Sequence, residues 1–219
     1  MPRFAAGVVK FQNEVYPENK DLFHELDRGQ APEALFITCS DSRIETAMIT
    51  QTAPGELFIC RNAGNIVPPP STHTGGMSAS IEFAVAALKV PHIVVCGHTQ
   101  CGAMKGAMNP EGLDKLPYVR DWLSYSRGAV EIVEELGAGL SEDEKMTLLL
   151  RQNVILQLQH LRSHPSVARR LAKGDVELHG WVYDIKTGAV DAYDPATGDF
   201  CPVDVRYAAE MKRLAADCA

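Results

Sequence analysis

The chain has 219 residues, of which 46% are apolar and 22% charged, proportions typical of a folded globular protein rather than of a disordered segment. Its net charge of −7 argues against a nucleic-acid partner, because phosphate binding needs a clustered basic surface. The length suits one compact domain, so we expect a single domain over residues 1–219 that acts on small molecules.

The N-terminal segment predicts a helical arm. Apolar residues recur at helical spacing over residues 4–28, and Pro17 should divide them into two short helices. Charged residues such as Lys10 and Glu14 interrupt the apolar run that a secretory signal peptide requires. No later stretch could span a bilayer. We therefore expect a cytoplasmic protein that binds no membrane.

An α/β core is expected over residues 33–200. The apolar run 34–38 predicts a buried strand that stops at Cys39, and residues 57–60 predict a second strand. A helix over residues 78–88 leads directly into a strand over residues 92–96. Such a β-α-β unit requires parallel strands, which indicates the α/β class with a mainly parallel central sheet flanked by helices.

The rest of the chain predicts scaffold elements. A Pro/Gly-rich loop is expected over residues 62–76, and two longer helices over residues 118–135 and 142–163. Residues 177–185 and 189–193 alternate well enough to form two strands of a hairpin.

Two segments that follow predicted strands carry the chemistry. Cys39, Asp41 and Arg43 share one face if this segment is extended, since side chains alternate along a strand. His98 and Cys101, three residues apart where a helix opens near residue 102, can converge on the same point. In open parallel sheets the working site lies beyond the carboxyl ends of the strands.

Two thiolates and one imidazole form a zinc ligand set with a fourth position left open, which distinguishes catalytic from structural zinc sites. The 58 residues between Cys39 and His98 also differ from the paired spacing of a zinc finger. In a reducing cytoplasm the remaining cysteines are expected to be inert packing residues rather than disulfides. They are Cys60, Cys96, Cys201 and Cys218.

The pattern Cys-x-Asp-x-Arg followed by His-x-x-Cys resembles the signature of the β-class carbonic anhydrases. The segments Arg61–Pro68 and His179–Asp184 add to this resemblance, which spans roughly residues 8–200. Within the family the chain looks most similar to the plant-type enzymes and to a bacterial branch associated with cyanate metabolism.

The resemblance implies reversible hydration of carbon dioxide to bicarbonate and a proton, by attack of zinc-bound hydroxide. One Zn²⁺ per subunit would be held by Cys39, His98 and Cys101. Asp41 would accept the hydrogen of the hydroxide, and Arg43 would keep Asp41 ionised and oriented.

The resemblance also implies a substrate pocket and an oligomer. Gln30, Phe58, Phe83 and Gly102 match pocket positions, with Gln30 reaching in from a neighbouring subunit. Phe83 departs from the tyrosine usual in the family, which puts a hydrogen-bonding role at this position in doubt. The family forms homodimers or higher homo-oligomers in which the N-terminal helices extend over the partner subunit.

Two other functions remain open from the sequence. A carbonyl sulfide or carbon disulfide hydrolase would use the same zinc chemistry on a similar linear molecule, and the motifs do not exclude it. A non-catalytic zinc-binding scaffold protein is the second alternative. In that protein Asp41 and Arg43 beside an open metal position would serve no clear purpose.

Overall fold

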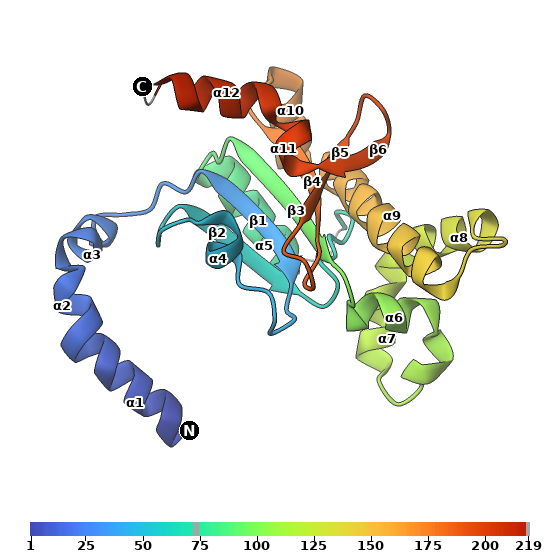
Figure 1. Cartoon of the computed structure of the whole chain (residues 1–219), viewed down its shortest axis with the longest axis horizontal. Coiled ribbons are helices and arrows are strands. Elements are labelled where there is room, and N and C mark those ends of the chain that lie inside the picture. Colours follow the sequence, from blue (N-terminus) through green and yellow to red (C-terminus); the bar gives the residue numbers. More distant parts are fainter. Residues whose placement is uncertain (72–74, 218–219) are drawn as a thin grey trace.

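The centre of the molecule is a six-stranded sheet with the order β2-β1-β3-β4-β5-β6 (Figure 1). The computed structural model describes residues 1–71 and 75–217, so Cys218 and part of the predicted 62–76 loop lie outside the described residues. The strands β2, β1, β3 and β4 run parallel to one another. Strand β5 pairs antiparallel with β4, and β6 pairs antiparallel with β5. The strands are β1 (Ala34–Cys39), β2 (Leu57–Asn62), β3 (His92–His98), β4 (Glu177–Tyr183), β5 (Val190–Asp194) and β6 (Asp199–Pro202).

Helices surround this sheet, as expected for the α/β class. Those that follow the N-terminal arm are α4 (Thr46–Thr50), α5 (Gly76–Glu82), α6 (Gly102–Met108), α7 (Pro117–Leu123), α8 (Arg127–Leu136), α9 (Glu142–Ser163), α10 (Pro165–Lys173), α11 (Val203–Arg206) and α12 (Ala208–Asp217). A π-helical turn, Phe83–Ala87, continues α5. None of the helices in the described ranges is long and apolar enough to cross a membrane.

The main core lies between the sheet and helices α5, α9 and α10. Every residue of β1 is buried, and its side chains alternate between the two faces of the sheet. Leu35 and Ile37 enter the main core, whereas Phe36 joins a smaller cluster with Val94 and Cys96 on the opposite face. The burial of both faces explains why this strand reads as a continuous apolar run.

The predicted hairpin and the long helix α9 are confirmed by the structure. Helix α9 begins at a capping box, in which the Ser141 hydroxyl accepts from the Glu144 N–H and the Glu144 carboxylate accepts from the Ser141 N–H. The single helix expected over residues 118–135 is wrong, because a 3-10 turn at Ser124–Ser126 separates α7 from α8. There the buried Ser126 hydroxyl bonds to Asn153 of α9, which fixes the chain at the break.

The N-terminal arm consists of α1 (Pro2–Lys10), α2 (Tyr16–Glu18) and α3 (Lys20–Asp27), and it extends away from the body (Figure 1). Pro17 does not divide the arm as predicted; the break comes at Asn19. A π-helical turn, Phe11–Val15, directly precedes α2, and its wider hydrogen-bonding pattern accommodates a proline that lacks an N–H.

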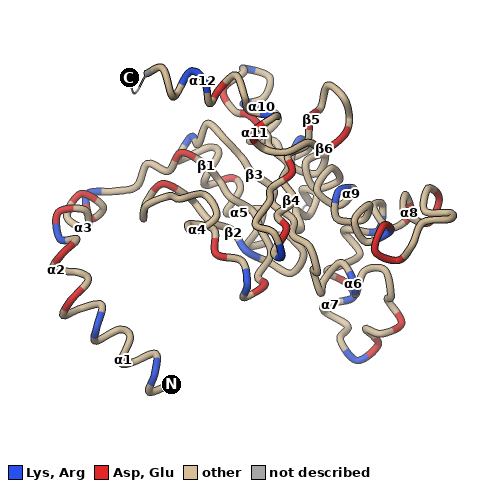
Figure 2. The backbone as a smooth tube through the Cα atoms, in the orientation of Figure 1, with Lys and Arg blue, Asp and Glu red and all other residues tan. Residues whose placement is uncertain are grey.

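The arm carries an apolar stripe that its own chain leaves exposed. Phe4 is 70% and Val8 56% exposed, and Phe11 and Val15 are each 40% exposed. No residue of α1, α2 or α3 is buried. Figure 2 shows acidic and basic residues interspersed along the backbone of the arm, so its apolar positions alternate with charged ones along the chain.

The C-terminal helices α11 and α12 were not predicted from the sequence. Tyr207, between them, joins this segment to β4 because its hydroxyl lies 2.9 Å from Nδ1 of His179 and accepts a 3.1 Å bond from Nε1 of Trp181. Burial lowers the pKa of His179 to about 4, so its imidazole is neutral near pH 7.

Gly180 permits the close approach of β4 to α9. A β-carbon at this position would lie 2.8 Å from Cγ1 of Val154 and 2.9 Å from Cδ1 of Leu158. Both neighbours belong to the main core and have little room to move.

We therefore expect Gly180→Ala to lower the free energy of unfolding by about 1–3 kcal/mol through overpacking. Urea denaturation of the metal-loaded protein measures the change. Gly112→Ala is the control, because a β-carbon there meets open space. Equal stability of the two variants would contradict the packing argument.

Candidate metal centre

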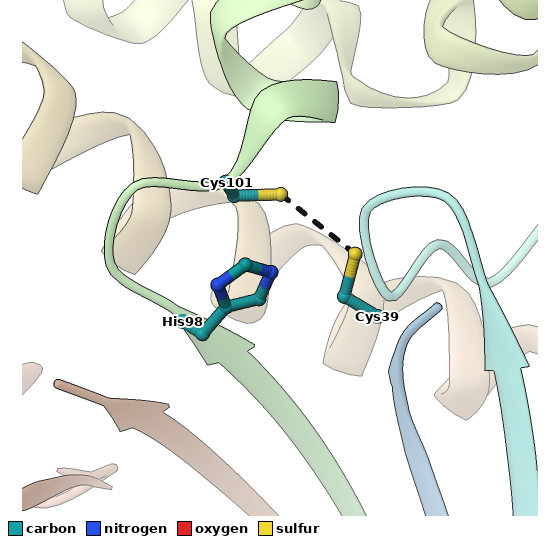
Figure 3. A group of neighbouring side chains, drawn as sticks. All are labelled: Cys39, His98 and Cys101. Carbon is teal, nitrogen blue, oxygen red and sulfur yellow. Dashed lines mark hydrogen bonds between the residues drawn. The ribbon is translucent and has the colours of Figure 1, made fainter. Parts of the chain in front are cut away.

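Cys39 and His98 are the last residues of the neighbouring parallel strands β1 and β3. Because parallel strands end at the same edge of a sheet, the two side chains meet there (Figure 3). Cys101 approaches from the segment that links β3 to α6, where it is the N-cap residue. The ligand atoms of the three residues lie within 4.8 Å of one another, as their spacing in the sequence predicts.

A strained turn brings Cys101 back over the end of β3. Gln100 has a φ of 58°, in the left-handed region that residues other than glycine rarely occupy. Its side chain accepts a 2.7 Å hydrogen bond from Lys105, and its carbonyl accepts one from Arg43. These contacts offset the local strain, which is a feature common at functional sites.

The chemistry of the three side chains fits a metal ion. His98 is fully buried; its Nδ1 donates to the Thr99 carbonyl, which leaves Nε2 as an acceptor without a hydrogen-bond partner. The sulfur atoms of Cys39 and Cys101 are 3.9 Å apart. Two sulfur ligands of a tetrahedral zinc ion with Zn–S bonds of about 2.3 Å are separated by roughly 3.8 Å.

The two thiols cannot both ionise easily without a cation. The hydrogen bond from Cys101 lowers the pKa of Cys39, and donating that bond raises the pKa of Cys101, to which burial and the negative charge of Cys39 add. The N–H of Gly64 donates to the Cys39 sulfur at 3.4 Å and favours the thiolate. A divalent cation between the sulfur atoms would remove their mutual repulsion.

Asp41 and Arg43 form a bidentate ion pair at the entrance to this centre. Nε of Arg43 donates to Oδ1 of Asp41 at 2.9 Å, and Nη2 donates to Oδ2 at 2.7 Å. These bonds hold the pKa of the Asp41 carboxyl well below its usual range. Oδ2 of Asp41 lies 3.9 Å from Nε2 of His98, which places the carboxylate beside the candidate metal position.

The expectation that this segment is extended is wrong. The N–H of Arg43 donates to the Asp41 carboxylate, and the N–H of Ile44 donates to the Asp41 carbonyl, so residues 41–44 form a turn. An aspartate side chain competes for backbone N–H groups in this way and so bends the chain after a strand. The turn still brings Asp41 and Arg43 together.

Arg61, at the end of β2, holds the turn against the sheet. Its guanidinium donates to the carbonyls of Cys39, Asp41 and Ile44 at 2.8–3.0 Å. Three carbonyl acceptors on one guanidinium satisfy most of its donors. Arg61 therefore fixes the position of the Cys39 backbone.

Sequence reasoning missed the polar residues of α9 that support the centre. Asn153 donates to the Gly64 carbonyl at 3.1 Å, and the Gln157 side chain accepts from the Val67 N–H at 2.8 Å. Gln157 also donates to Asn153, so the pair holds the loop whose Gly64 contacts Cys39. Their signal in the sequence is two amide side chains, four residues apart, on the apolar side of a helix.

The predicted pocket residues occupy three separate places. Phe58 and Phe83 lie together, with ring centroids 6.0 Å apart. Gly102 is the first residue of α6, directly after Cys101. Gln30 is exposed on the segment between the arm and β1. The structure thus pairs the two phenylalanines, and the roles of all four residues stay predictions.

Comparisons with known proteins agree with this geometry. The carbonic anhydrase family model matches residues 34–190. A carbonic anhydrase of Pseudomonas aeruginosa is 50% identical over 194 residues, covering 89% of this chain and 88% of the relative. Carbonic anhydrase 1 of Escherichia coli O157:H7 is 46% identical, covering 93% of this chain and 92% of the relative.

Solved structures of β-carbonic anhydrases also resemble this chain. The structure of the β-carbonic anhydrase CcaA is 41% identical with a TM-score of 0.89, covering 92% of this chain and 91% of that one. A tetrameric β-carbonic anhydrase of Sordaria macrospora is 33% identical with a TM-score of 0.76, covering 88% of this chain and 97% of that one. With its fold, its Cys-His-Cys centre and these relatives, the chain belongs to the carbonic anhydrase family.

Proposed function

We propose that this protein catalyses the reversible hydration of carbon dioxide at a Zn²⁺ ion held by Cys39, His98 and Cys101. The observation that carries the proposal is the buried Nε2 of His98, which has no hydrogen-bond partner and lies beside two sulfur atoms. A zinc ion held there would lower the pKa of a water molecule and would so supply a nucleophile near neutral pH.

Asp41 would orient this water. Its carboxylate is held ionised by Arg43, so it accepts a hydrogen and cannot donate one. By accepting a hydrogen from the water, Asp41 would direct an oxygen lone pair toward the carbon of the substrate. Arg43 is in turn fixed by the Gln100 carbonyl at 3.1 Å, which ties its position to the ligand-bearing turn.

The same centre would also act on carbonyl sulfide or carbon disulfide, as the sequence left open. The relatives are named carbonic anhydrases, which favours carbon dioxide as the substrate. The ion pair of Asp41 and Arg43 argues against a non-catalytic scaffold protein. A cytoplasmic location and membership of the plant-type branch stay predictions from the sequence.

We expect Cys101→Ser to lose one equivalent of zinc and to lower carbon dioxide hydration to the uncatalysed rate, because a neutral hydroxyl replaces a thiolate ligand. Stopped-flow assays combined with metal analysis measure both changes. Cys201→Ser, which alters a cysteine outside the centre, should match the wild type. A Cys101→Ser protein that is active without zinc would overturn the assignment.

We expect Asp41→Asn to lower kcat about 100-fold, because the amide can donate a hydrogen bond and no longer fixes the direction of the water. Zinc content should be unchanged, since Asp41 is not a ligand in this arrangement. Arg43→Lys keeps the charge and loses the bidentate geometry, so it should have a smaller effect. An unchanged kcat in Asp41→Asn would remove this role.

The functional unit is a homodimer or a larger homo-oligomer in which the arm covers a partner subunit. The exposed stripe of Phe4, Val8, Phe11 and Val15 supports this proposal, because apolar surface of this kind marks contact sites. The exposed Gln30 is then available to a neighbouring subunit, where it would complete a pocket with Phe58 and Phe83.

We expect the double variant Val8→Glu with Phe11→Glu to release monomers, because two charges would enter the apolar contact. Size-exclusion chromatography with light scattering gives the mass directly. Asn13→Glu, which adds a charge at a polar position of the same arm, is the control. A double variant that keeps the wild-type mass would contradict the role of the stripe.

A further inference from the structure

A second group of metal-ligating side chains lies at the opposite end of the sheet from Cys39 and His98. His92 is the first residue of β3, and Glu177 is its partner at the start of β4. His179 is two residues further along β4, so its side chain points to the same face as that of Glu177. The ligand atoms of the three residues lie within 4.8 Å of one another.

The spacing of the two imidazoles matches a coordination site. Nδ1 of His92 and Nε2 of His179 are 3.2 Å apart. Two nitrogen ligands of a tetrahedral zinc ion with Zn–N bonds of 2.0–2.1 Å are separated by roughly 3.3 Å. Oε2 of Glu177 is 4.0 Å from the His92 nitrogen and 3.9 Å from the His179 nitrogen. Its side chain is 71% exposed and free to close the remaining gap.

Tyr207 orients His179 in the way that ligating histidines are usually oriented. Trp181 can only donate, so the 3.1 Å bond from its Nε1 makes the Tyr207 oxygen an acceptor. Nδ1 of His179 lies 2.9 Å from the same oxygen. Because the Tyr207 hydroxyl can also donate, this orientation applies when Nδ1 of His179 carries the proton and donates to the oxygen, and the lone pair of Nε2 is then directed at His92 and Glu177. Metal-ligating histidines commonly use their second nitrogen for such an outer hydrogen bond.

The surroundings favour a cation. The three residues border a cavity of about 350 Å³ whose lining also contains Glu33, Glu56 and Glu210. Against the four carboxylates stands one guanidinium, Arg206, which lies over the Tyr207 ring and 3.8 Å from Asp194. The cavity is therefore negative when the histidines are neutral.

We propose that His92, Glu177 and His179 bind a second divalent transition-metal ion, with Zn²⁺ as the natural occupant. Two imidazoles and a carboxylate form a known zinc ligand set that leaves one position for water. The alternative is that the two imidazoles share a proton without any metal. The ligands come from the starts of two strands, and Tyr207 comes from the C-terminal segment, so the ion would join these three parts of the chain.

Native mass spectrometry of the whole protein, equilibrated with free Zn²⁺, tests the proposal by counting ions per chain. We expect the wild type to hold one zinc more than His92→Gln and Glu177→Gln. Glu33→Gln is the matched control, because it removes a carboxylate of the same cavity outside the ligand set and should keep the second ion. Tyr207→Phe should lower the affinity for the second ion about 10- to 100-fold.

Cys101→Ser separates this site from the proposed catalytic centre, since it should lose the first ion and keep the second. A single zinc per wild-type chain at saturating metal would overturn the proposal. A second zinc that persists in both His92→Gln and Glu177→Gln would overturn it as well, because that ion would be bound elsewhere. Circular dichroism of each variant without added metal checks that the fold is intact.

Discussion

The parallel pairing of β1 with β3 is the constraint on which the metal centre depends. It aligns Thr38 with Cys96, so the two strands finish at the same edge with Cys39 and His98 as their last residues. Both strands are buried over most of their length, and a shift by one residue would move every core side chain to the other face. The apolar core therefore determines where the thiolate and the imidazole lie.

Side chains outside the Cys39, His98 and Cys101 cluster support the centre by hydrogen bonding to backbone carbonyls and amides around it. Arg61 binds the carbonyls that follow β1, while Asn153 and Gln157 of α9 hold the loop that contains Gly64. Each of these side chains bonds to backbone groups, so it positions the ligands without touching the metal position. Such support limits the movement of Cys39, His98 and Cys101. A metal-assisted reaction requires these side chains to stay in fixed positions.

The convergence of Cys39, His98 and Cys101 and the parallel sheet could be predicted from the sequence because both depend on local patterns. Apolar runs mark the strands, and Cys39 and His98 end two of them. The turn at Asp41 was missed because its carboxylate competes with the extended backbone for the Arg43 N–H. The break between α7 and α8 and the position of Tyr207 depend on contacts with distant residues, Asn153 and His179, which periodicity does not reveal.

If the arm packs on a second copy as proposed, its helical order would depend on the concentration of the chain. Short helices gain most of their stability from packing, and the apolar stripe of α1 packs against no buried surface of its own chain. In the proposed oligomer, the arm of a newly made chain would gain its full helical order only when it meets another copy. Dilution would expose the arm to proteases before it affected the core.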